Sequence, residues 1–326
     1  MSDKVLSLIR WAILLRYPRL SYWYWKVGHY KRIPNPANPQ TANDKFFWRK
    51  IFDRRPEFTE ISDKLLVRDW LKRNSINIEG PPVLWSGTDP ADIPDHLLSG
   101  VVVVKANHGS RTNLFLQEAP SDRSAVNRKL RKYLRKPHGR KKLEWGYFGV
   151  SRKLFVEKII PNIVAEFKIF TFGERVERLQ IIYGRFSEEG ISADVWLPDG
   201  QGGWTLFEGS PEITRNANLP MPETTQKALD VARQIGDHFD HMRVDILTDG
   251  HSLWFSELTI YNLAGKIPIV GRDPAEGVNT SWDLQKSWFM QTPQNGWKKL
   301  YADRLRKVIA SADQTFKSRR RYDFLD

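Results

Sequence analysis

The sequence predicts a protein of α+β or α/β class, with two lobes, a cleft between them and a helical N-terminal extension. A run of valines, Val101–Val104, has the continuous hydrophobicity of a strand buried on both faces. Residues 165–172 and 176–183 alternate well enough to predict a sheet with one covered face. Amphipathic patterns at 122–136 and 223–239 predict helices that pack on such strands. The 326 residues, 40% of them hydrophobic, are enough for a sizeable core.

Residues 4–32 form a basic and aromatic segment with seven Lys or Arg and no acidic residue. Such a composition is typical of a helix that lies in a lipid headgroup layer. A terminal helix whose aromatic side chains pack on the protein itself fits equally well. The apolar run at 5–15 is interrupted by Arg10 and falls short of the roughly 20 residues that span a membrane. No small-residue cleavage site follows it, so we expect a cytoplasmic protein, peripheral to the inner face of the plasma membrane if the segment binds lipid.

The remaining elements follow from periodicity and from turn residues. Residues 62–73 predict a helix, whereas 80–94, with its prolines and glycines, is expected to be mostly loop. A strand is expected at 153–160, and a hairpin around an Asp-Gly turn at 242–260. A helix at 297–316 closes the fold.

Composition limits the function. The chain has no cysteine, which excludes disulfides and thiolate metal sites within it. A net charge of +13 and a pI near 9.7 favour a polyanionic partner. Residues 128–142 hold nine Lys or Arg and no acid, and four more lie in 317–326. This charge fits a solvated face, an acidic saccharide or a membrane surface. No nucleic-acid recognition signature is present, so nucleic acid is not expected as a partner.

The stretch VVVVKANHGSRTN, residues 101–113, carries a cation at the end of the buried strand. The backbone amides of a small-residue turn can converge on a phosphate, and a lysine beside the turn adds a point charge. Lys105 ends the valine run, and His108, Gly109 and Ser110 form the turn. The stretch is not a P-loop, and a lysine at a strand end is commonly a solvated boundary.

The hairpin raises the question of whether two carboxylates share a face. Side chains alternate along a strand, so the answer depends on the loop. A two-residue loop would pair Asp245 with Trp254 and leave Glu257 on the far face. A loop with an odd number of residues would pair Arg243 with Glu257, and Asp245 with Phe255.

In the second register Arg243, Asp245, Glu257 and Thr259 share one face. Two neighbouring carboxylates repel each other and favour a cation between them, and hard oxygen ligands suit Mg²⁺ that bridges phosphates. Arg243 would then steady a transferring phosphoryl group. The alternative is an Arg–Glu cross-strand pair without a metal.

A third segment, FVEKIIPNIVAEFKIF, places Glu157 where a strand enters a proline-containing connection. On the next strand Glu166 and Lys168 fall on one face, which by itself is typical of a solvent-facing pair.

The order of these segments resembles the ATP-grasp superfamily, and more narrowly its TupA-like branch, associated with teichuronopeptide biosynthesis. The resemblance covers residues 40–270, from the TANDKFFWRK stretch to the hairpin. It implies the ATP-grasp fold, in which ATP lies in a cleft between two α+β lobes. It further implies the domains 1–40 (basic aromatic segment and linker), 41–100 (helical region), 101–160 (first lobe) and 161–326 (second lobe with the metal hairpin and C-terminal helix).

The resemblance also implies contacts with ATP. Lys64 matches a lysine that reaches nucleotide phosphate, Lys105 one that contacts the α-phosphate, and Glu157 a hinge residue near adenine and ribose. The turn corresponds to the flexible phosphate-covering loop. The implied nucleotide-binding residues are Lys64, Lys105, His108, Gly109, Ser110, Glu157 and Lys168.

By the same resemblance, Asp245 and Glu257 match the Mg²⁺ carboxylates, with two ions expected. Thr259 stands where many ligases of the superfamily have asparagine, and Asn262 follows further on. Arg243 matches the arginine beside the transferred phosphate, and with Lys105 it is the expected catalytic residue.

The main hypothesis is therefore an ATP- and Mg²⁺-dependent carboxylate–amine ligase acting through an acyl phosphate in cell-surface polysaccharide or envelope biosynthesis. Its partners would be a carboxylate, such as a uronic acid or polysaccharide, and an amine. A kinase acting on a sugar or polysaccharide is the first alternative. A non-catalytic protein that binds polyanions or a membrane through residues 4–32 is the second.

Overall fold

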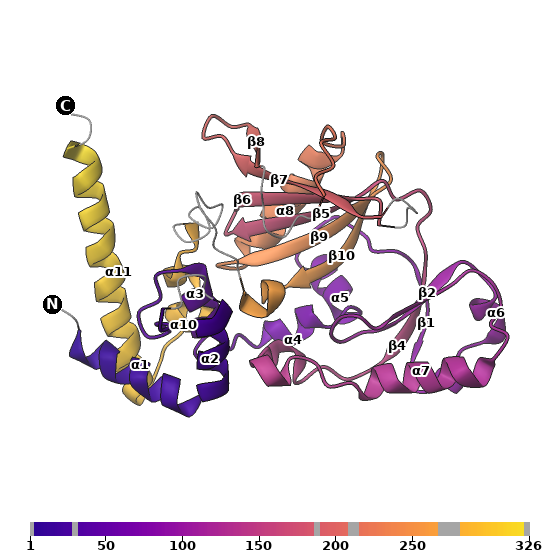
Figure 1. Ribbon diagram of the computed structural model, residues 1–326, viewed down its shortest axis with the longest axis horizontal. Helices are drawn as coiled ribbons and strands as arrows, with labels where there is room; N and C mark the ends of the chain where they lie inside the picture. The colour runs from indigo at the N-terminus through magenta and orange to yellow at the C-terminus, as the bar shows by residue number, and fades with distance from the viewer. Residues whose placement is uncertain (1–2, 28–31, 186–189, 208–214, 267–280, 323–326) are drawn as a thin grey trace.

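Two antiparallel sheets organise the chain in the computed structural model, which describes residues 3–27, 32–185, 190–207, 215–266 and 281–322, with side chains up to Ser311 except Val27 (Figure 1). One sheet has four strands in the order β1-β4-β2-β3, and the other has six in the order β10-β9-β5-β6-β7-β8. The sheets lie in separate parts of the molecule, joined by the connection from β4 to β5.

The strands are β1 (Val83–Gly87), β2 (Val102–Ala106), β3 (Asn113–Leu116), β4 (Leu154–Lys158), β5 (Ala165–Phe172), β6 (Arg175–Tyr183), β7 (Ser192–Pro198), β8 (Trp204–Phe207), β9 (Met242–Thr248) and β10 (Leu253–Thr259). The α-helices are α1 (Lys4–Arg16), α2 (Pro18–Val27), α3 (Ala42–Ile51), α4 (Glu57–Ser62), α5 (Leu66–Arg73), α6 (Asp95–Leu98), α7 (Arg123–Arg135), α8 (Thr225–Asp237), α10 (Trp288–Gln291) and α11 (Gly296–Tyr322). Short 3-10 turns are η1 (Pro90–Asp92), η2 (Arg140–Lys142), η3 (Trp145–Tyr147), η4 (Asn262–Gly265) and η5 (Leu284–Lys286).

The four-stranded sheet forms the smaller lobe around the valine run. β2 pairs with β4 on one side and with β3 on the other. Val102 and Val104 are buried in the core of this lobe and Val103 is buried at the opposite face, as predicted, whereas Val101 precedes the strand and is exposed. Helix α7 begins at Asp122, whose carboxylate accepts the Ala125 amide at 2.8 Å. Its stripe of Val126, Leu130 and Tyr133 packs on the core of this lobe. This confirms the helix predicted at 122–136.

The six-stranded sheet carries the larger lobe. Its central strands β5, β6 and β9 are almost fully buried, and α8 packs on one face of them. The strands predicted at 165–172 and 176–183 are present as β5 and β6, and the predicted hairpin as β9 and β10. The expectation that only one face of β5 and β6 would be covered was wrong, because nearly all their residues are buried.

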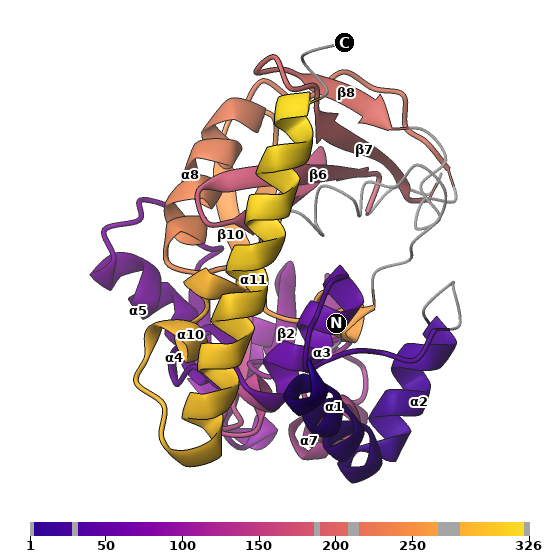
Figure 2. The ribbon, with the colours of Figure 1, turned by 90° about the vertical axis from the view of Figure 1, so that its left-hand side faces the viewer.

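The helices at the two ends of the chain form a third group, in which α1 lies beside α11 (Figures 1 and 2). Helix α3 supplies fully buried aromatic side chains, Phe46, Phe47 and Trp48, to the large core. Tyr24 of α2 stacks on Phe47 with ring centroids 4.8 Å apart. Part of the basic aromatic segment therefore packs on the protein itself.

Helix α1 is hydrophobic on both faces. Leu6, Ile13 and Leu14 are buried, yet on the outer face Leu8 is 72% and Leu15 78% exposed. No helix in the described part of the chain is both long enough and apolar enough to cross a membrane.

Two further expectations were wrong in detail. Residues 80–94 are not simply loop, because Val83–Gly87 is strand β1, which pairs with β4. The helix expected at 62–73 is interrupted, since α4 ends at Ser62 and α5 begins at Leu66. Lys64 lies in this interruption.

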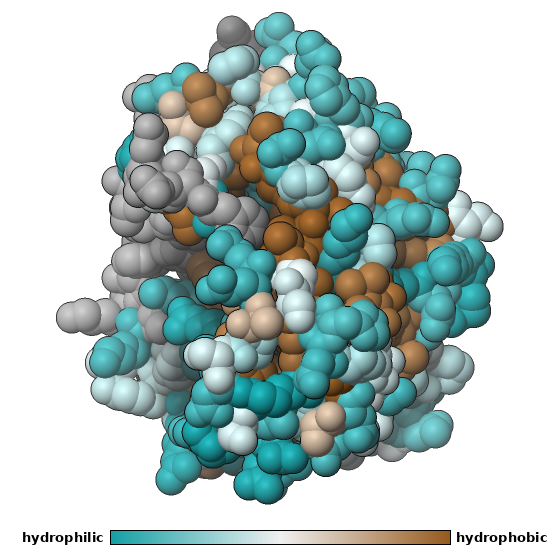
Figure 3. All heavy atoms as spheres, turned by 90° about the vertical axis from the view of Figure 1, so that its right-hand side faces the viewer, coloured by the Kyte–Doolittle hydropathy of each residue, from teal (hydrophilic) through white to brown (hydrophobic). Residues whose placement is uncertain are grey.

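Figure 3 views the side on which the smaller lobe lies in Figure 1 and shows hydrophobic side chains in a central band bordered by hydrophilic ones.

Candidate active site

A pocket of about 130 Å³ lies between the two sheets. Its apolar wall combines Val103 of β2, Leu247 of β9 and the connection from β4 to β5, including Ile159, Ile160 and Ile163. Its charged residues are Lys105, Glu157, Lys158, Glu166 and Arg185. An apolar slot with charges at its rim can hold a flat heterocycle and present its phosphates to cations.

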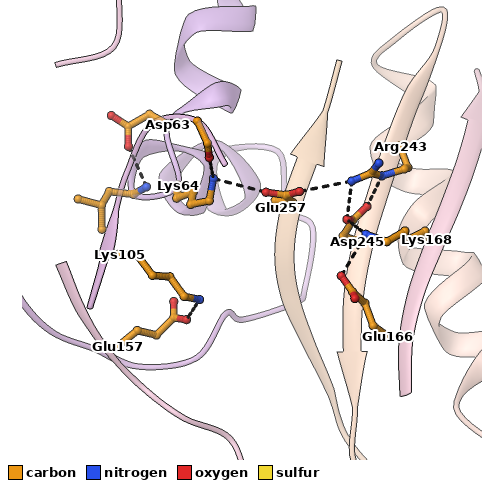
Figure 4. A network of polar contacts seen from close by, with 11 residues as sticks. Asp63, Lys64, Lys105, Glu157, Glu166, Lys168, Arg243, Asp245 and Glu257 are labelled. Carbon is orange, nitrogen blue, oxygen red and sulfur yellow. Dashed lines mark hydrogen bonds and ion pairs between the residues drawn. The ribbon is translucent and has the colours of Figure 1, made fainter. Parts of the chain in front are cut away.

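Lys105 of β2 and Glu157 of β4 are diagonal neighbours on adjacent strands and form an ion pair (Figure 4). The second oxygen of Glu157 accepts from Arg68 of α5 at 2.7 Å. The Glu157 side chain is only 5% exposed, so it is a buried carboxylate held by two cations. Lys105 lies in the pocket wall, where an incoming phosphate can compete for its ammonium group.

Lys64 reaches across the cleft from the break between α4 and α5. Its ammonium group donates to the Gly109 carbonyl at 2.8 Å and lies 3.4 Å from Glu257 of the other sheet. The break is fixed by Asp63, which accepts the Leu65 amide at 2.8 Å and so begins α5. Asn107 holds this segment against the end of β2, because its side chain donates to Asp63 at 2.7 Å.

The turn after β2 is partly rigid and partly exposed. His108 is buried, its Nε2 lies 3.2 Å from the Lys136 carbonyl, and burial lowers the pKa of its imidazole. Gly109 has φ +73°, and a Cβ there would lie 2.6 Å from the His138 ring, so glycine is required. Ser110 is exposed. The side chain of His108 therefore stabilises the turn from behind, and Ser110 is open to a ligand.

Asp245 and Glu257 lie directly opposite each other on β9 and β10. Neither cross-strand pairing proposed from the sequence is right, because a register shift between Phe255 and Glu257 places Ser256 as an extra residue. The shift brings both carboxylates to one face, with Arg243 opposite Thr259. The shared face is thus as predicted in the second register.

Arg243 links the members of this face (Figure 4). It donates to both oxygens of Asp245 at 2.7 Å and to the Asn262 amide oxygen at 2.6 Å, and it lies 3.3 Å from Glu257. Burial alone would raise the pKa of the Asp245 carboxyl, but Arg243 and Lys168 outweigh it and lower this pKa. Burial would lower the pKa of Arg243, and the charge of Asp245 reverses this effect.

Lys168 is not a solvent-facing residue. It lies opposite Asp245 on β5, donates to that carboxylate at 2.8 Å and lies 3.2 Å from Glu166. Arg185 forms an ion pair with the other oxygen of Glu166. Every candidate site residue named from the sequence therefore lies at this cleft or in the turn beside it.

Three neighbouring residues were missed from the sequence: Arg68, Arg185 and Asn262. Asn262 was noticed only as a later asparagine. The turn that carries it has two non-glycine residues at positive φ, Leu263 at 46° and Ala264 at 60°. Such residues cost about 1–3 kcal/mol each and persist where the surroundings hold them. Arg68, Arg185 and Asn262 were missed because their partners lie far away in the sequence, and no local sequence pattern shows such a pairing.

The donor set fits Mg²⁺ in part. Asp245, Glu257 and the Asn262 amide supply hard oxygen atoms within one network, which is the chemistry that Mg²⁺ prefers. No group of three His, Cys, Asp or Glu side chains with metal-site geometry occurs among the described residues. The carboxylates would hold an ion that also binds phosphate oxygens, since Mg²⁺ commonly uses one or two carboxylates together with substrate phosphates.

Lys105 of the valine-rich strand and Leu247 and Ser256 of the hairpin thus line one pocket between the two sheets. A family model described as TupA-like ATPgrasp matches residues 44–269, more than half of the chain. The chain belongs to this family. No curated protein matches it in sequence.

Several solved structures are similar in fold. L-amino acid ligase from Bacillus licheniformis is 17% identical, with a TM-score of 0.40, over 66% of this chain and 47% of that one. N5-carboxyaminoimidazole synthetase from Staphylococcus aureus is 14% identical, with a TM-score of 0.38, over 72% and 52%. D-alanine–D-alanine ligase from Bacillus anthracis is 17% identical, with a TM-score of 0.33, over 61% and 56%. This chain thus spans about half the length of these structures.

Proposed function

We propose that this protein is an ATP- and Mg²⁺-dependent, ADP-forming carboxylate–amine ligase of cell-surface polysaccharide or envelope biosynthesis. One observation carries the proposal. Asp245, Glu257 and Arg243 share one face of the hairpin, and the ammonium group of Lys64, from the opposite side of the cleft, lies 3.4 Å from the Glu257 carboxylate. Membership of the TupA-like ATP-grasp family supports it. The proposed substrates are a uronic acid, free or in a polysaccharide, and an amine such as an amino acid.

Each side chain has a role in this proposal. Val103, Ile160 and Leu247 hold the adenine, while Lys105 exchanges Glu157 for a phosphate oxygen. Lys64, Lys168 and the amides of the His108–Ser110 turn bind further phosphate oxygens. These groups orient the nucleotide and exclude water, which is the main contribution of a protein to phosphoryl transfer.

The metal hairpin supplies charge at the other end of the nucleotide. Asp245 and Glu257, with Thr259 or Asn262 as a further oxygen donor, would hold Mg²⁺; two ions are expected. Bound Mg²⁺ neutralises phosphate charge and polarises the transferred group. Arg243, fixed by Asp245 on one side and Asn262 on the other, presents its guanidinium group to the developing charge.

ADP release against a panel of uronic acids and amino acids tests this function. ADP formation should require both a carboxylate and an amine, and hydroxylamine should trap the acyl phosphate as a hydroxamate. A phosphorylated sugar without any amide would instead identify a kinase. If Mg²⁺·ATP produces neither calorimetric heat nor a thermal shift, the non-catalytic alternative is correct.

The outer surface of α1 and α2 supports a location at the cytoplasmic face of an anionic membrane. On α1, Leu8 and Leu15 are exposed, with Trp11 half-exposed between them. On α2, Tyr22 and Trp25 are exposed and stack with centroids 5.6 Å apart. Apolar and aromatic residues flanked by basic ones suit a headgroup layer. We propose that residues 4–32 bind this surface.

Vesicle sedimentation tests this location. The full chain should bind vesicles of phosphatidylglycerol and phosphatidylcholine, and the double variant Leu8→Glu/Leu15→Glu should lose at least about tenfold in affinity, since two apolar side chains no longer enter the lipid. Leu219→Glu, at an exposed leucine outside this segment, is the matched control. Equal binding by both variants would refute the location.

A further inference from the structure

Lys50 of α3 is a lysine completely removed from solvent. Burial lowers the pKa of its ammonium group to about 7, while the nearby Glu144 opposes this effect and Lys142 adds to it. A buried lysine is costly, and most cores of this size use an apolar residue instead. Its position therefore calls for a specific partner.

That partner is the turn that follows the metal hairpin. The Lys50 ammonium group donates to the Ala264 carbonyl at 2.7 Å. Ala264 is one of the two residues of this turn, with Leu263, that hold a positive φ without being glycine. The carbonyl points at Lys50 only while the backbone keeps this conformation, so the hydrogen bond and the unusual conformation support each other.

Three aromatic rings surround the same ammonium group. Trp23 lies 5.4 Å away, Tyr24 5.5 Å away, and Tyr261, which precedes the turn, 5.5 Å away. Rings at this distance attract a cation through their faces. A Cβ at Gly265 would lie 2.4 Å from the Tyr24 hydroxyl, so α2 also packs directly on the turn. The cage thus joins α2, α3 and the turn.

The turn leads to the reacting groups. Asn262, two residues before Ala264, accepts from Arg243 at 2.6 Å, and Arg243 binds Asp245 at 2.7 Å. A shift of the turn would move the amide oxygen that fixes one end of the Arg243 guanidinium group. Lys50 joins this series of contacts at its far end, through the hydrogen bond to the Ala264 carbonyl.

We propose that Lys50 is a positioning residue: by holding the Ala264 carbonyl inside a cage that α2 helps to build, it keeps Asn262 and hence Arg243 in place. Only the kinetic part of this inference rests on the proposed function. It makes α2 part of the scaffold of the active site, in addition to any contact that its outer face makes with lipid.

Helix α3 provides a matched control. Lys45 is also buried, and it donates to the Trp282 carbonyl at 2.6 Å. Lys45→Met and Lys50→Met each remove a buried lysine–carbonyl hydrogen bond from the same helix, but the carbonyl that Lys45 binds belongs to Trp282, whereas the carbonyl that Lys50 binds belongs to the turn. If the lysines contributed only to the stability of the fold, Lys45→Met and Lys50→Met should have similar effects.

Hydrogen–deuterium exchange of the full chain, without ligand, is the first measurement. The Ala264 amide donates to Tyr261 and the Lys266 amide to Leu263. In Lys50→Met the peptide over residues 261–266 should exchange at least about tenfold faster, because the turn opens more often. Lys45→Met should leave this peptide unchanged. Unchanged exchange in Lys50→Met would overturn the proposal.

ATP turnover is the second measurement. In Lys50→Met, kcat should fall at least about tenfold while KM for ATP stays within about twofold, since the nucleotide pocket is intact. Equal kcat in the two lysine variants would also overturn the proposal. If the unmodified protein shows no turnover, the ligase function fails and exchange alone decides. If Lys50→Met does not fold, Trp23→Leu removes one cage wall, and the same peptide must exchange faster.

Discussion

Asp245 and Glu257, the two carboxylates of the β9–β10 hairpin, differ in burial, and this difference predicts different costs for removing them. Asp245 is completely buried and accepts three charged hydrogen bonds, two from Arg243 at 2.7 Å and one from Lys168 at 2.8 Å. Breaking a buried ion pair from one side costs about 3–5 kcal/mol. Asp245→Asn should therefore unfold about 4–8 °C lower, at roughly 1.5 °C for each kcal/mol in a chain of 326 residues.

Glu257 is 34% exposed, and its cations lie further away, at 3.3 and 3.4 Å. Solvent screens such pairs, and they contribute about 0–1 kcal/mol. Glu257→Gln should thus unfold within about 2 °C of the unmodified protein. Both variants should lose ATP turnover by more than about 100-fold, because in the proposed function each removes a carboxylate that would hold the Mg²⁺ needed to neutralise phosphate charge.

Differential scanning fluorimetry and an ADP-release assay measure the two effects separately. Glu177→Gln, which removes a carboxylate from the Arg175–Glu177 pair on β6 of the same sheet, is the control and should change neither quantity. Two results would contradict the argument: an equal loss of Tm in Asp245→Asn and Glu257→Gln, or normal turnover in Glu257→Gln.

Three further predictions concern the smaller lobe. Lys105→Met should fold normally, because Glu157 keeps its hydrogen bond to Arg68. Calorimetry should nevertheless show about 10- to 150-fold weaker ATP binding, the effect expected for the loss of one charged hydrogen bond. Gly109→Ala, which forces a Cβ against His138 at positive φ, should raise KM for ATP and lower Tm; an unchanged KM would show that the turn does not cover phosphate. Burial lowers the pKa of His138 to about 4, so the unfolded chain binds this proton more readily, and stability should fall as pH drops from 6.5 to 4. His138→Phe should weaken that pH dependence of Tm.

Local sequence patterns predict much of the fold. Strand β5 matches its predicted range because its alternation is continuous, and α7 begins where Asp122 caps it. Four strands, β1, β3, β7 and β8, were not assigned from the sequence. These strands have four to seven residues each, and β1 follows two prolines, so their sequence patterns are too short to identify them as strands. They form because a neighbouring strand pairs with them.

The site was predictable in composition and less so in geometry. Whether Asp245 and Glu257 share a face depends on the extra residue Ser256. The sequence trace of this register shift is the three-residue spacing between the buried Phe255 and Leu258, which a strictly alternating strand would not have. Arg68 contacts Glu157 from 89 positions away, and Lys50 contacts Ala264 from 214. Contacts of this range arise from packing of whole elements, so they appear only in three dimensions.

The ion pairs of the cleft have a consequence for how a ligand enters it. Lys105, Lys64 and Lys168 each already hold a carboxylate, so a triphosphate cannot simply add to vacant cations. In the proposed function it would displace these acidic side chains, which would then turn towards solvent or towards a metal. Binding is then an exchange of one anion for another. Affinity for the nucleotide should accordingly depend less on salt than it would in a groove of unpaired lysines, and the freed carboxylates become available to the metal as the phosphates take their place.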